Sequence, residues 1–168
     1  SNTISYRDTA ARVVLENGTY YRIIFKEYQA EYDHLMHSGL YKTLTEKGLM
    51  IKHEEIQQAA SSKDKQYKKL QPDQIPFQSY PFEWSYNQWR KVLYAYLQIN
   101  QIALAHGMIL KDATPFNFYF EGGRAILLDT SSFDFFKEGD AWIAYRQFCS
   151  EMLGPFALMH YNGQRWAR

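Results

Sequence analysis

Apolar and polar positions alternate on both sides of a turn signal near the start of the chain. Residues 12–26 contain runs of Val, Tyr and Ile that flank Asn17-Gly18. Because this dipeptide accepts the positive φ angles of a tight turn, the pattern predicts a β-hairpin.

The spacing of apolar residues becomes helical after this hairpin. Residues 27–38 place Tyr28, Glu31 and Leu35 on one side of a predicted helix, and Gly39 ends it. A second short helix is expected over 40–47. The apolar run that follows, Leu49-Met50-Ile51, indicates a short strand.

The most polar stretch of the chain covers residues 52–74. Its Lys cluster is interleaved with Asp and Gln, which is typical of a solvated helix or a mobile loop rather than an anion site. Pro76 and Pro81 bracket aromatic residues further on. We therefore expect an extended linker near residues 76–84.

The strongest helix signal begins at Ser85. Ser85 and Gln88 have the spacing of a capping box, and an apolar stripe continues to about His106. Gly107 ends this helix.

A second hairpin and a final helix are expected after the long helix. The apolar runs 118–120 and 125–128 are joined across two glycines, which predicts the hairpin. Asp140 is the expected N-cap of a helix that carries Trp142, and Pro155 interrupts or restarts that helix. This order of elements fits an α+β fold of two lobes, 1–80 and 81–168, better than an alternating βαβ sheet.

Composition excludes several classes of protein. The chain has 168 residues, a net charge of +1 and a single cysteine, Cys149. It has no apolar run long enough for a membrane span, and one cysteine is too few for a disulfide framework. The near-neutral charge gives no reason to expect nucleic acid or an anionic membrane as a partner. No signal peptide opens the chain, so we expect a cytoplasmic protein.

Candidate chemistry is concentrated in residues 106–134. An apolar run leads into a polar loop with Asp112 and Asn117, and the second hairpin then delivers Asp129 at the end of an apolar strand. Because that hairpin folds back on the loop, Asp129 can approach Asn117. One amide oxygen and one carboxylate form a hard-oxygen environment that suits Mg²⁺.

These residues resemble the catalytic loop of protein kinases and of aminoglycoside-phosphotransferase-like kinases. Asp112-Ala-Thr-Pro-Phe-Asn117 matches D-x-x-x-x-N, Lys111 stands where the loop usually has Arg, and Asp129 matches the metal-binding Asp of D-F-G. The resemblance implies a two-lobed kinase-like fold. It also implies that Asp112, with Lys111, acts on the acceptor hydroxyl of a small-molecule substrate, while Asn117 and Asp129 hold Mg²⁺ against ATP.

Other parts of the kinase pattern are missing. The chain has no G-x-G-x-x-G and no V-A-I-K, so Arg22 or Lys26 is the nearest substitute for the nucleotide-binding lysine, with Glu31 as its partner on the following helix. Few residues follow Asp129, which indicates a small, truncated form of the fold. Ordinary protein kinase activity is therefore not expected.

The chain as a whole has a second resemblance, carried by four phrases. It resembles the N-terminal region of bacterial nodulation-related, SAM-dependent methyltransferase proteins through residues 31–41, 53–55, 110–112 and 142–148. In those proteins a methyltransferase domain follows this region. This chain has no strand followed by a glycine-rich SAM loop, so we expect no methylation by the chain itself.

Two functions stay open from the sequence. One is a degenerate or small-molecule phosphotransferase that uses Mg-ATP in a cleft between residues 12–51 and 107–134. The other is a non-catalytic ligand-binding or regulatory module, attached to a C-terminal methyltransferase domain of the same protein.

Overall fold

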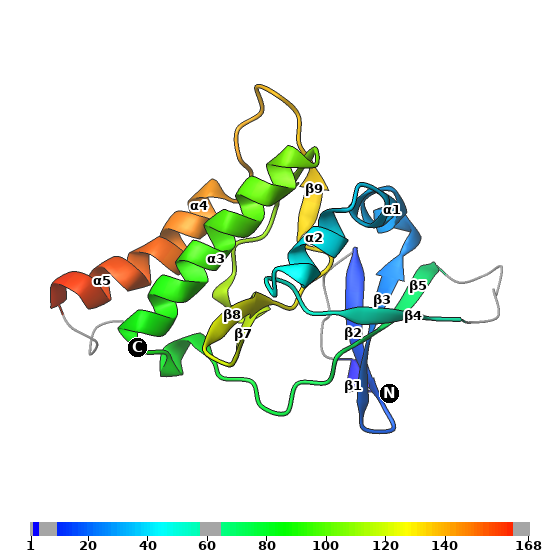
Figure 1. The fold of residues 1–168 in the computed structure, drawn as a ribbon, viewed down its shortest axis with the longest axis horizontal. Coiled ribbons are helices and arrows are strands. Elements are labelled where there is room, and N and C mark those ends of the chain that lie inside the picture. Colours follow the sequence, from blue (N-terminus) through cyan, green and yellow to red (C-terminus); the bar gives the residue numbers. More distant parts are fainter. Residues whose placement is uncertain (1, 4–9, 58–64, 163–168) are drawn as a thin grey trace.

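The structure is a computed structural model, and it describes residues 2–3, 10–57 and 65–162. An antiparallel sheet forms one part of the molecule, and helices with two short hairpin-like ladders form the other (Figure 1). The protein is thus a mixed α+β fold, as the order of sequence patterns predicts.

Five strands form the sheet in the order β1-β2-β3-β5-β4, and every neighbouring pair is antiparallel. The strands are β1 (Asn2–Thr3), β2 (Ala11–Glu16), β3 (Thr19–Phe25), β4 (His53–Ile56) and β5 (Gln66–Pro72). The predicted first hairpin is confirmed as β2–β3. Its turn residues Asn17 and Gly18 have φ angles of 50° and 79°, the left-handed values that a two-residue hairpin turn requires.

The expectation of a solvated helix or loop over 52–74 is wrong for the described residues. This stretch contributes β4 and β5, and residues 58–64 lie outside the described part of the chain. Its charges pair across strands, with Lys68 bound to Glu55 at 2.6 Å and Lys69 to Glu16 at 2.5 Å. Charged cross-strand pairs stabilise a sheet although they hide the apolar alternation in the sequence.

Two helices connect the first hairpin to β4. They are α1 (Gln29–His37), preceded by the short turn η1 (Lys26–Tyr28), and α2 (Leu40–Glu46), which confirms both predicted helices. The predicted strand over residues 49–51 is not present. Met50 instead makes one isolated parallel bridge to Leu127, flanked by two backbone hydrogen bonds of 2.9 Å.

The linker and the long helix follow the prediction. After the short turn η2 (Pro81–Glu83), helix α3 (Tyr86–Ala105) begins at its N-cap Ser85. The Ser85 side chain accepts a hydrogen bond from the Gln88 N–H, and the Gln88 side chain accepts one from the Ser85 N–H, so the capping box is complete.

Two short ladders follow α3 and hold the polar loop between them. Strand β6 (Met108–Leu110) pairs with β9 (Phe133–Phe135), and β7 (Phe118–Glu121) pairs with β8 (Arg124–Leu127). The predicted second hairpin is therefore confirmed. The polar loop lies between β6 and β7 and ends in the turn η3 (Pro115–Asn117).

The C-terminal helical segment begins later than predicted. Asp140 does not cap it, because the helix α4 (Tyr145–Gln147) starts after a turn and continues into a π-helical stretch, η4 (Phe148–Leu153), and α5 (Gly154–Asn162). The Trp142 indole donates to the Leu110 carbonyl at 2.8 Å, which holds this residue outside the helix. Pro155 lies inside this continuous helical run, directly after the π-helical stretch, so it does not end the helix.

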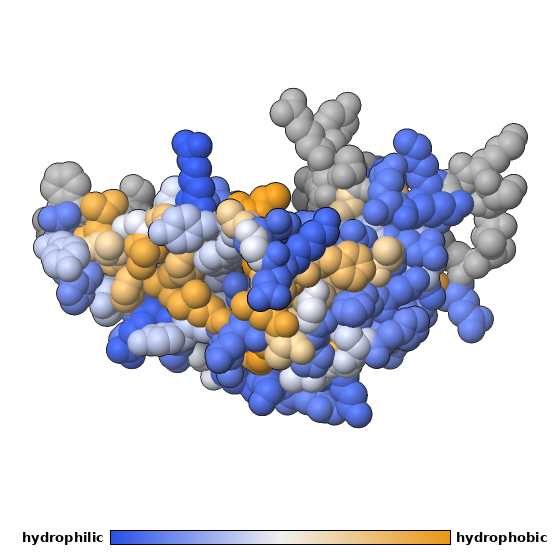
Figure 2. All heavy atoms as spheres, turned by 90° about the horizontal axis from the view of Figure 1, so that it is seen from above, coloured by the Kyte–Doolittle hydropathy of each residue, from blue (hydrophilic) through white to orange (hydrophobic). Residues whose placement is uncertain are grey.

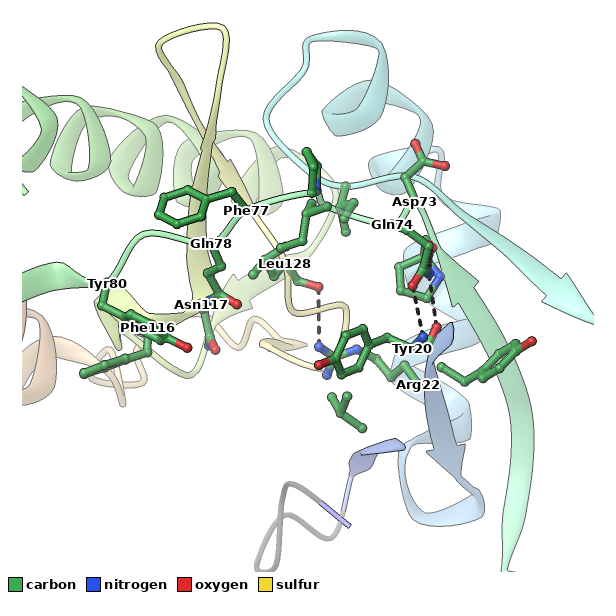
Figure 3. A pocket seen from close by; sticks show the side chains of 16 residues that line it. Tyr20, Arg22, Asp73, Gln74, Phe77, Gln78, Tyr80, Phe116, Asn117 and Leu128 are labelled. Atoms are coloured by element: carbon green, nitrogen blue, oxygen red, sulfur yellow. Dashed lines mark hydrogen bonds between the residues drawn. The ribbon is translucent and has the colours of Figure 1, made fainter. Parts of the chain in front are cut away.

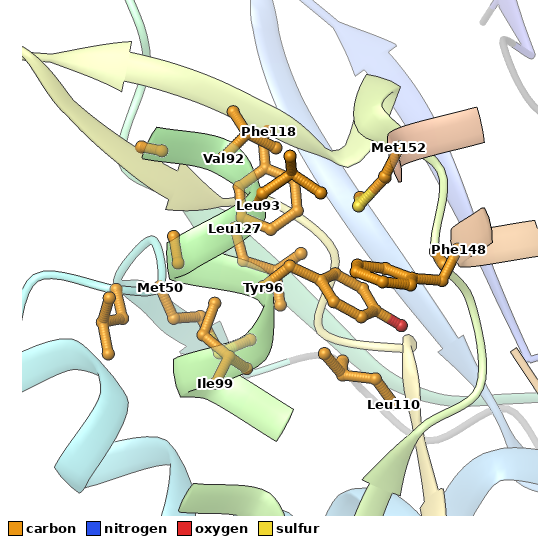
Figure 4. Close-up of a cluster of buried hydrophobic side chains, with 14 of the residues drawn as sticks. Met50, Val92, Leu93, Tyr96, Ile99, Leu110, Phe118, Leu127, Phe148 and Met152 are labelled. Carbon is orange, nitrogen blue, oxygen red and sulfur yellow. The ribbon is translucent and has the colours of Figure 1, made fainter. Parts of the chain in front are cut away.

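The main core lies under α3, and its largest members are shown in Figure 4. Tyr96, Phe118 and Phe148 pack there beside Leu110, and none of them is more than 8% exposed. Leu40, Leu44 and Met50, which precede the linker, belong to the same core. A smaller core under the sheet contains Ala10, Ala11, Ile24, Tyr28, Tyr32 and Leu70.

The surface differs between the two parts. Seen from above, apolar residues gather over the half that carries the helices, while the half that carries the sheet is mostly hydrophilic (Figure 2). Exposed apolar side chains of the helical half include Ile143, Tyr145, Leu153, Leu158 and Tyr161. In the described ranges, none of the helices has the length and apolar character needed to cross a lipid bilayer.

Candidate functional site: a cleft beside the Arg22–Asp129 ion pair

A cleft of about 760 Å³ lies between the sheet and the polar loop, with the linker along its side (Figure 3). This volume is within the range of small-molecule binding sites. Lining residues come from both ranges that were predicted to form the cleft, 12–51 and 107–134. The segment from Pro72 to Tyr80 forms a third wall. They are Val13, Tyr20, Tyr21, Arg22, Ile51, Pro72, Asp73, Gln74, Ile75, Pro76, Phe77, Gln78, Tyr80, Phe116, Asn117 and Leu128.

The segment that leads from β5 into the linker is attached to the sheet by Gln74. The Tyr20 N–H donates to Gln74 Oε1 at 3.0 Å, and Gln74 Nε2 donates to the Tyr20 carbonyl at 3.3 Å and to the Pro72 carbonyl at 2.7 Å. Both interactions with Tyr20 are visible in Figure 3. This wall of the cleft is therefore fixed to strand β3.

Arg22 joins strand β3 to Leu128 and Asp129, the residues that follow β8. Its side chain leaves β3 on the face opposite to that of Ile23, because side chains alternate along a strand. Arg22 Nη1 forms an ion pair with Asp129 Oδ1, and Nη2 donates to the Leu128 carbonyl at 3.4 Å. Both charged side chains are largely shielded from water, at 16% and 12% exposed.

Both carboxylate oxygens of Asp129 accept hydrogen bonds. Oδ1 accepts from the Ser131 N–H at 2.9 Å and from the Ser131 hydroxyl at 2.7 Å, and Oδ2 accepts from the Ser132 hydroxyl at 3.0 Å. Burial alone raises the pKa of Asp129, but the Arg22 charge and these hydrogen bonds outweigh it and hold the pKa below its ordinary value. Asp129 is thus an ionised carboxylate that accepts hydrogen bonds on both oxygens.

The polar loop is tied to Asp129 through Ser132. Asn117 Nδ2 donates to Asp112 Oδ2 at 3.2 Å and to the Ser132 hydroxyl at 3.3 Å. Asp112 Oδ1 accepts from the Thr114 N–H at 3.1 Å, an Asx-type turn that shapes the loop. The structure therefore brings Asp112, Asn117 and Asp129 together, as the folded-back hairpin predicts.

Lys111 does not line the cleft. Its ammonium group lies 4.5 Å from the centroid of the Tyr28 ring, a cation–π contact. The Tyr28 hydroxyl donates to the Phe133 carbonyl at 2.7 Å, and burial among carboxylates raises the pKa of this hydroxyl well above its ordinary value. Lys111 and Tyr28 thus fix η1 against the start of β9.

Glu31 is not brought to Arg22 as a salt-bridge partner. Among the described residues, its Oε2 atom is buried and has no hydrogen-bond partner. The only ion pair of Arg22 within the described ranges is the one with Asp129. In protein kinases the lysine on the third strand pairs with a glutamate on the following helix, so this cation has a different partner here.

These residues do not fit a magnesium ion in the arrangement found. Mg²⁺ requires oxygen ligands at about 2.0–2.1 Å in octahedral geometry, whereas Asp129 offers both oxygens to Arg22, Ser131 and Ser132. Asn117 directs its amide nitrogen toward Asp112 and Ser132. Within the described ranges, no three His, Cys, Asp or Glu residues are grouped to hold a metal. Metal binding by Asn117 and Asp129 stays a prediction.

Sequence reasoning missed the residues that complete this site. Ser131 and Ser132 donate hydrogen bonds to Asp129, and Gln74 attaches the segment before the linker to strand β3. A run of hydroxyl residues directly after an Asp at the end of a strand is a recognisable signal for local side-chain hydrogen bonds. Gln74 carries no such signal, because its partner Tyr20 is 54 residues away in the sequence.

A second polar cluster lies outside the cleft, between α1 and β4. His53 Nε2 lies 3.2 Å from the Tyr32 hydroxyl, which donates to Glu55 at 2.8 Å. The other ring nitrogen of His53 is buried without a partner in the described part of the chain. Burial therefore lowers the pKa of His53 to about 4.

Comparison with known proteins gives one informative match. No protein-family profile matches the chain. The chain is 35% identical over 80 residues to the nodulation protein NoeA of Rhizobium meliloti (strain 1021). Those residues are 48% of this chain and 17% of that protein, so the match spans only a small part of the relative. It supports the predicted resemblance to nodulation-related proteins.

Proposed function

We propose that the chain is a non-catalytic ligand-binding module of a nodulation-related protein. One observation carries this proposal: Arg22, which lines a cleft of ligand size, and two serines occupy the carboxylate of Asp129. A carboxylate bonded in this way shapes a binding site. The match to NoeA supports the nodulation-related context.

We further propose that the fold is a small, two-lobed kinase-like fold with lobes at 1–80 and 81–168. The order of elements supports this: a sheet with two helices between its strands, a linker, a long helix, a polar loop and a hairpin. The cleft lies where the two lobes would meet. By the second resemblance, a methyltransferase domain of the same protein is the partner that such a module would regulate.

Phosphoryl transfer from Mg-ATP to a small molecule is the second candidate. It is favoured by the bonded chain of side chains from Asp112 through Asn117 and Ser132 to Asp129. By the kinase resemblance, Asp112 would accept the proton of the acceptor hydroxyl. This function requires that Arg22 release Asp129.

A ligand screen with a blocked cleft tests the first proposal. Thermal shifts are measured with sugars, amino acids, nucleosides and nucleotides, and repeated with Val13→Trp, which places a large ring in the cleft from β2. We expect at least one compound to raise the melting temperature of the wild type and not that of the variant. Equal shifts in both proteins, or none in either, would refute the proposal.

Turnover of radiolabelled ATP separates the two candidates. The non-catalytic proposal expects no release or transfer of phosphate above background. Transfer that disappears in Asp112→Asn, with the fold retained by circular dichroism, would establish the phosphotransferase instead.

A further inference from the structure

The cleft combines apolar walls with few charges. Val13, Ile51 and Leu128 contribute aliphatic surface, and Gln78 contributes an amide that can both donate and accept hydrogen bonds. Asn117, whose Nδ2 donates to Asp112 and Ser132, contributes its amide oxygen as an acceptor. Flat ring systems with heteroatoms match such surroundings, because their faces need apolar contact and their edges need polar partners.

The charges that line the cleft oppose an anionic ligand. Among the described lining residues, Arg22 and Asp73 are the charged ones. Arg22 is committed to Asp129, so the cation is balanced and the Asp73 carboxylate is left over. A polyphosphate chain brought into this part of the cleft would meet negative charge with no unpaired cation from the described lining to offset it.

The Arg22–Asp129 ion pair supplies the positive charge that a metal ion would otherwise bring to the Asp129 carboxylate. A divalent cation at a carboxylate neutralises charge and fixes the position of the side chain. Here the Arg22 guanidinium neutralises Asp129, and the hydroxyls of Ser131 and Ser132 fix its orientation. Leu128, beside Asp129, is bound through its carbonyl to the same guanidinium.

We infer that Arg22 stands in for the divalent cation at Asp129, so that this cleft takes an uncharged, ring-bearing ligand of nucleoside size without a metal ion. The inference rests on the proposed ligand-binding function and specifies its ligand class.

Calorimetric titration with adenosine and with ATP tests this inference on the wild-type chain. Each compound is titrated once with EDTA and once with millimolar Mg²⁺. We expect adenosine to bind with a Kd that changes less than about twofold between the two buffers, and ATP to bind at least about tenfold more weakly. Binding of ATP that tightens about tenfold or more with Mg²⁺, or no binding of adenosine, would overturn the inference.

Arg22→Gln provides an independent readout. It removes the guanidinium and leaves the Asp129 carboxylate open to a cation. We expect Mn²⁺ binding, followed by electron paramagnetic resonance, to be absent in the wild type and present in the variant. Arg12→Gln is the matched control, because Arg12 lies on the neighbouring strand and pairs with Ile23, on the opposite face of the sheet from Arg22. Mn²⁺ binding by the wild type as tight as by Arg22→Gln would overturn the inference.

If Arg22→Gln does not fold, the EDTA and Mg²⁺ titrations of the wild type decide alone. Failure of the inference is distinguishable from failure of the proposed function. A ligand from another class that is lost in Val13→Trp keeps the module and refutes its ligand class, whereas no ligand at all refutes both.

Discussion

The helical part and the sheet part of the molecule are held together in different ways. The core under α3 contains most of the fully buried side chains, including Leu44, Tyr96 and Phe118. The core under the sheet is small, and the sheet depends on polar links such as Arg22 to Asp129 and Tyr28 to Phe133. We therefore expect the helical part to supply most of the stability of the fold.

The largest expected effect comes from the same substitution in both cores. Leu44 and Leu70 are both 0% exposed. Leu44→Ala should lower the free energy of unfolding by about 4 kcal/mol, and Leu70→Ala by about 2 kcal/mol, because a small core collapses more easily around the lost volume. Urea denaturation measures both. A larger decrease in the free energy of unfolding for Leu70→Ala than for Leu44→Ala would contradict the view that the core under α3 supplies more stability than the core under the sheet.

Asp129→Ala tests the link between the parts. Removing one partner of a buried ion pair leaves the Arg22 charge unpaired, and we expect a loss of about 3 kcal/mol in stability. Amide hydrogen exchange should accelerate in β3 more than in α3. Asp140→Ala, at an exposed position, is the control and should have little effect. Unchanged exchange in β3 would show that the ion pair does not hold the sheet.

Acidification should act on the sheet through His53. Its folded pKa of about 4 lies below its ordinary value of 6.5, so between these values the unfolded chain binds a proton that the folded chain does not. Stability contributed by His53 is therefore lost as the pH falls, by about 2 kcal/mol between about pH 7 and pH 4.5.

His53→Gln isolates this contribution. Asp129, whose folded pKa is lowered, also loses its stabilising charge in acid, and it does so in both proteins. Urea unfolding at the two pH values should therefore show a smaller decrease for the variant than for the wild type. Equal decreases would mean that His53 is not titrated on unfolding in this range.

The smallest expected effect is at the surface of α2. Lys42 and Glu46 form an exposed i, i+4 pair with a separation of 3.8 Å. Lys42→Ala should change stability by less than about 0.5 kcal/mol. A loss similar to that of Leu44→Ala, measured by the same urea denaturation, would indicate that α2 is held by charge rather than by its buried leucines.

The elements that local chemistry determines were predictable from the sequence. Asn17-Gly18 determines a turn, and Ser85 with Gln88 determines the start of a helix, whatever the rest of the chain does. Strands β4 and β5 were not predictable in this way. Their stability comes from pairing with β3 and from links such as Lys68 to Glu55, which local periodicity does not reveal.

The candidate site, too, was predictable only where its residues are close to one another in the sequence. The proximity of Asp112, Asn117 and Asp129 follows from a loop and a hairpin that are adjacent in the sequence. The choice of Asp129 rather than Glu31 as the partner of Arg22 depends on a contact between residues 107 positions apart. Spacing alone could not decide between these two carboxylates.

The bridge between Met50 and Leu127 has a consequence for how the chain could be divided. Leu40, Leu44 and Met50 come before the linker, but their apolar surface is covered by residues that come after it. Two polypeptides made by cutting at the linker would each expose surface that the other normally covers. Such halves would be expected to regain the native fold only by reassembling with each other.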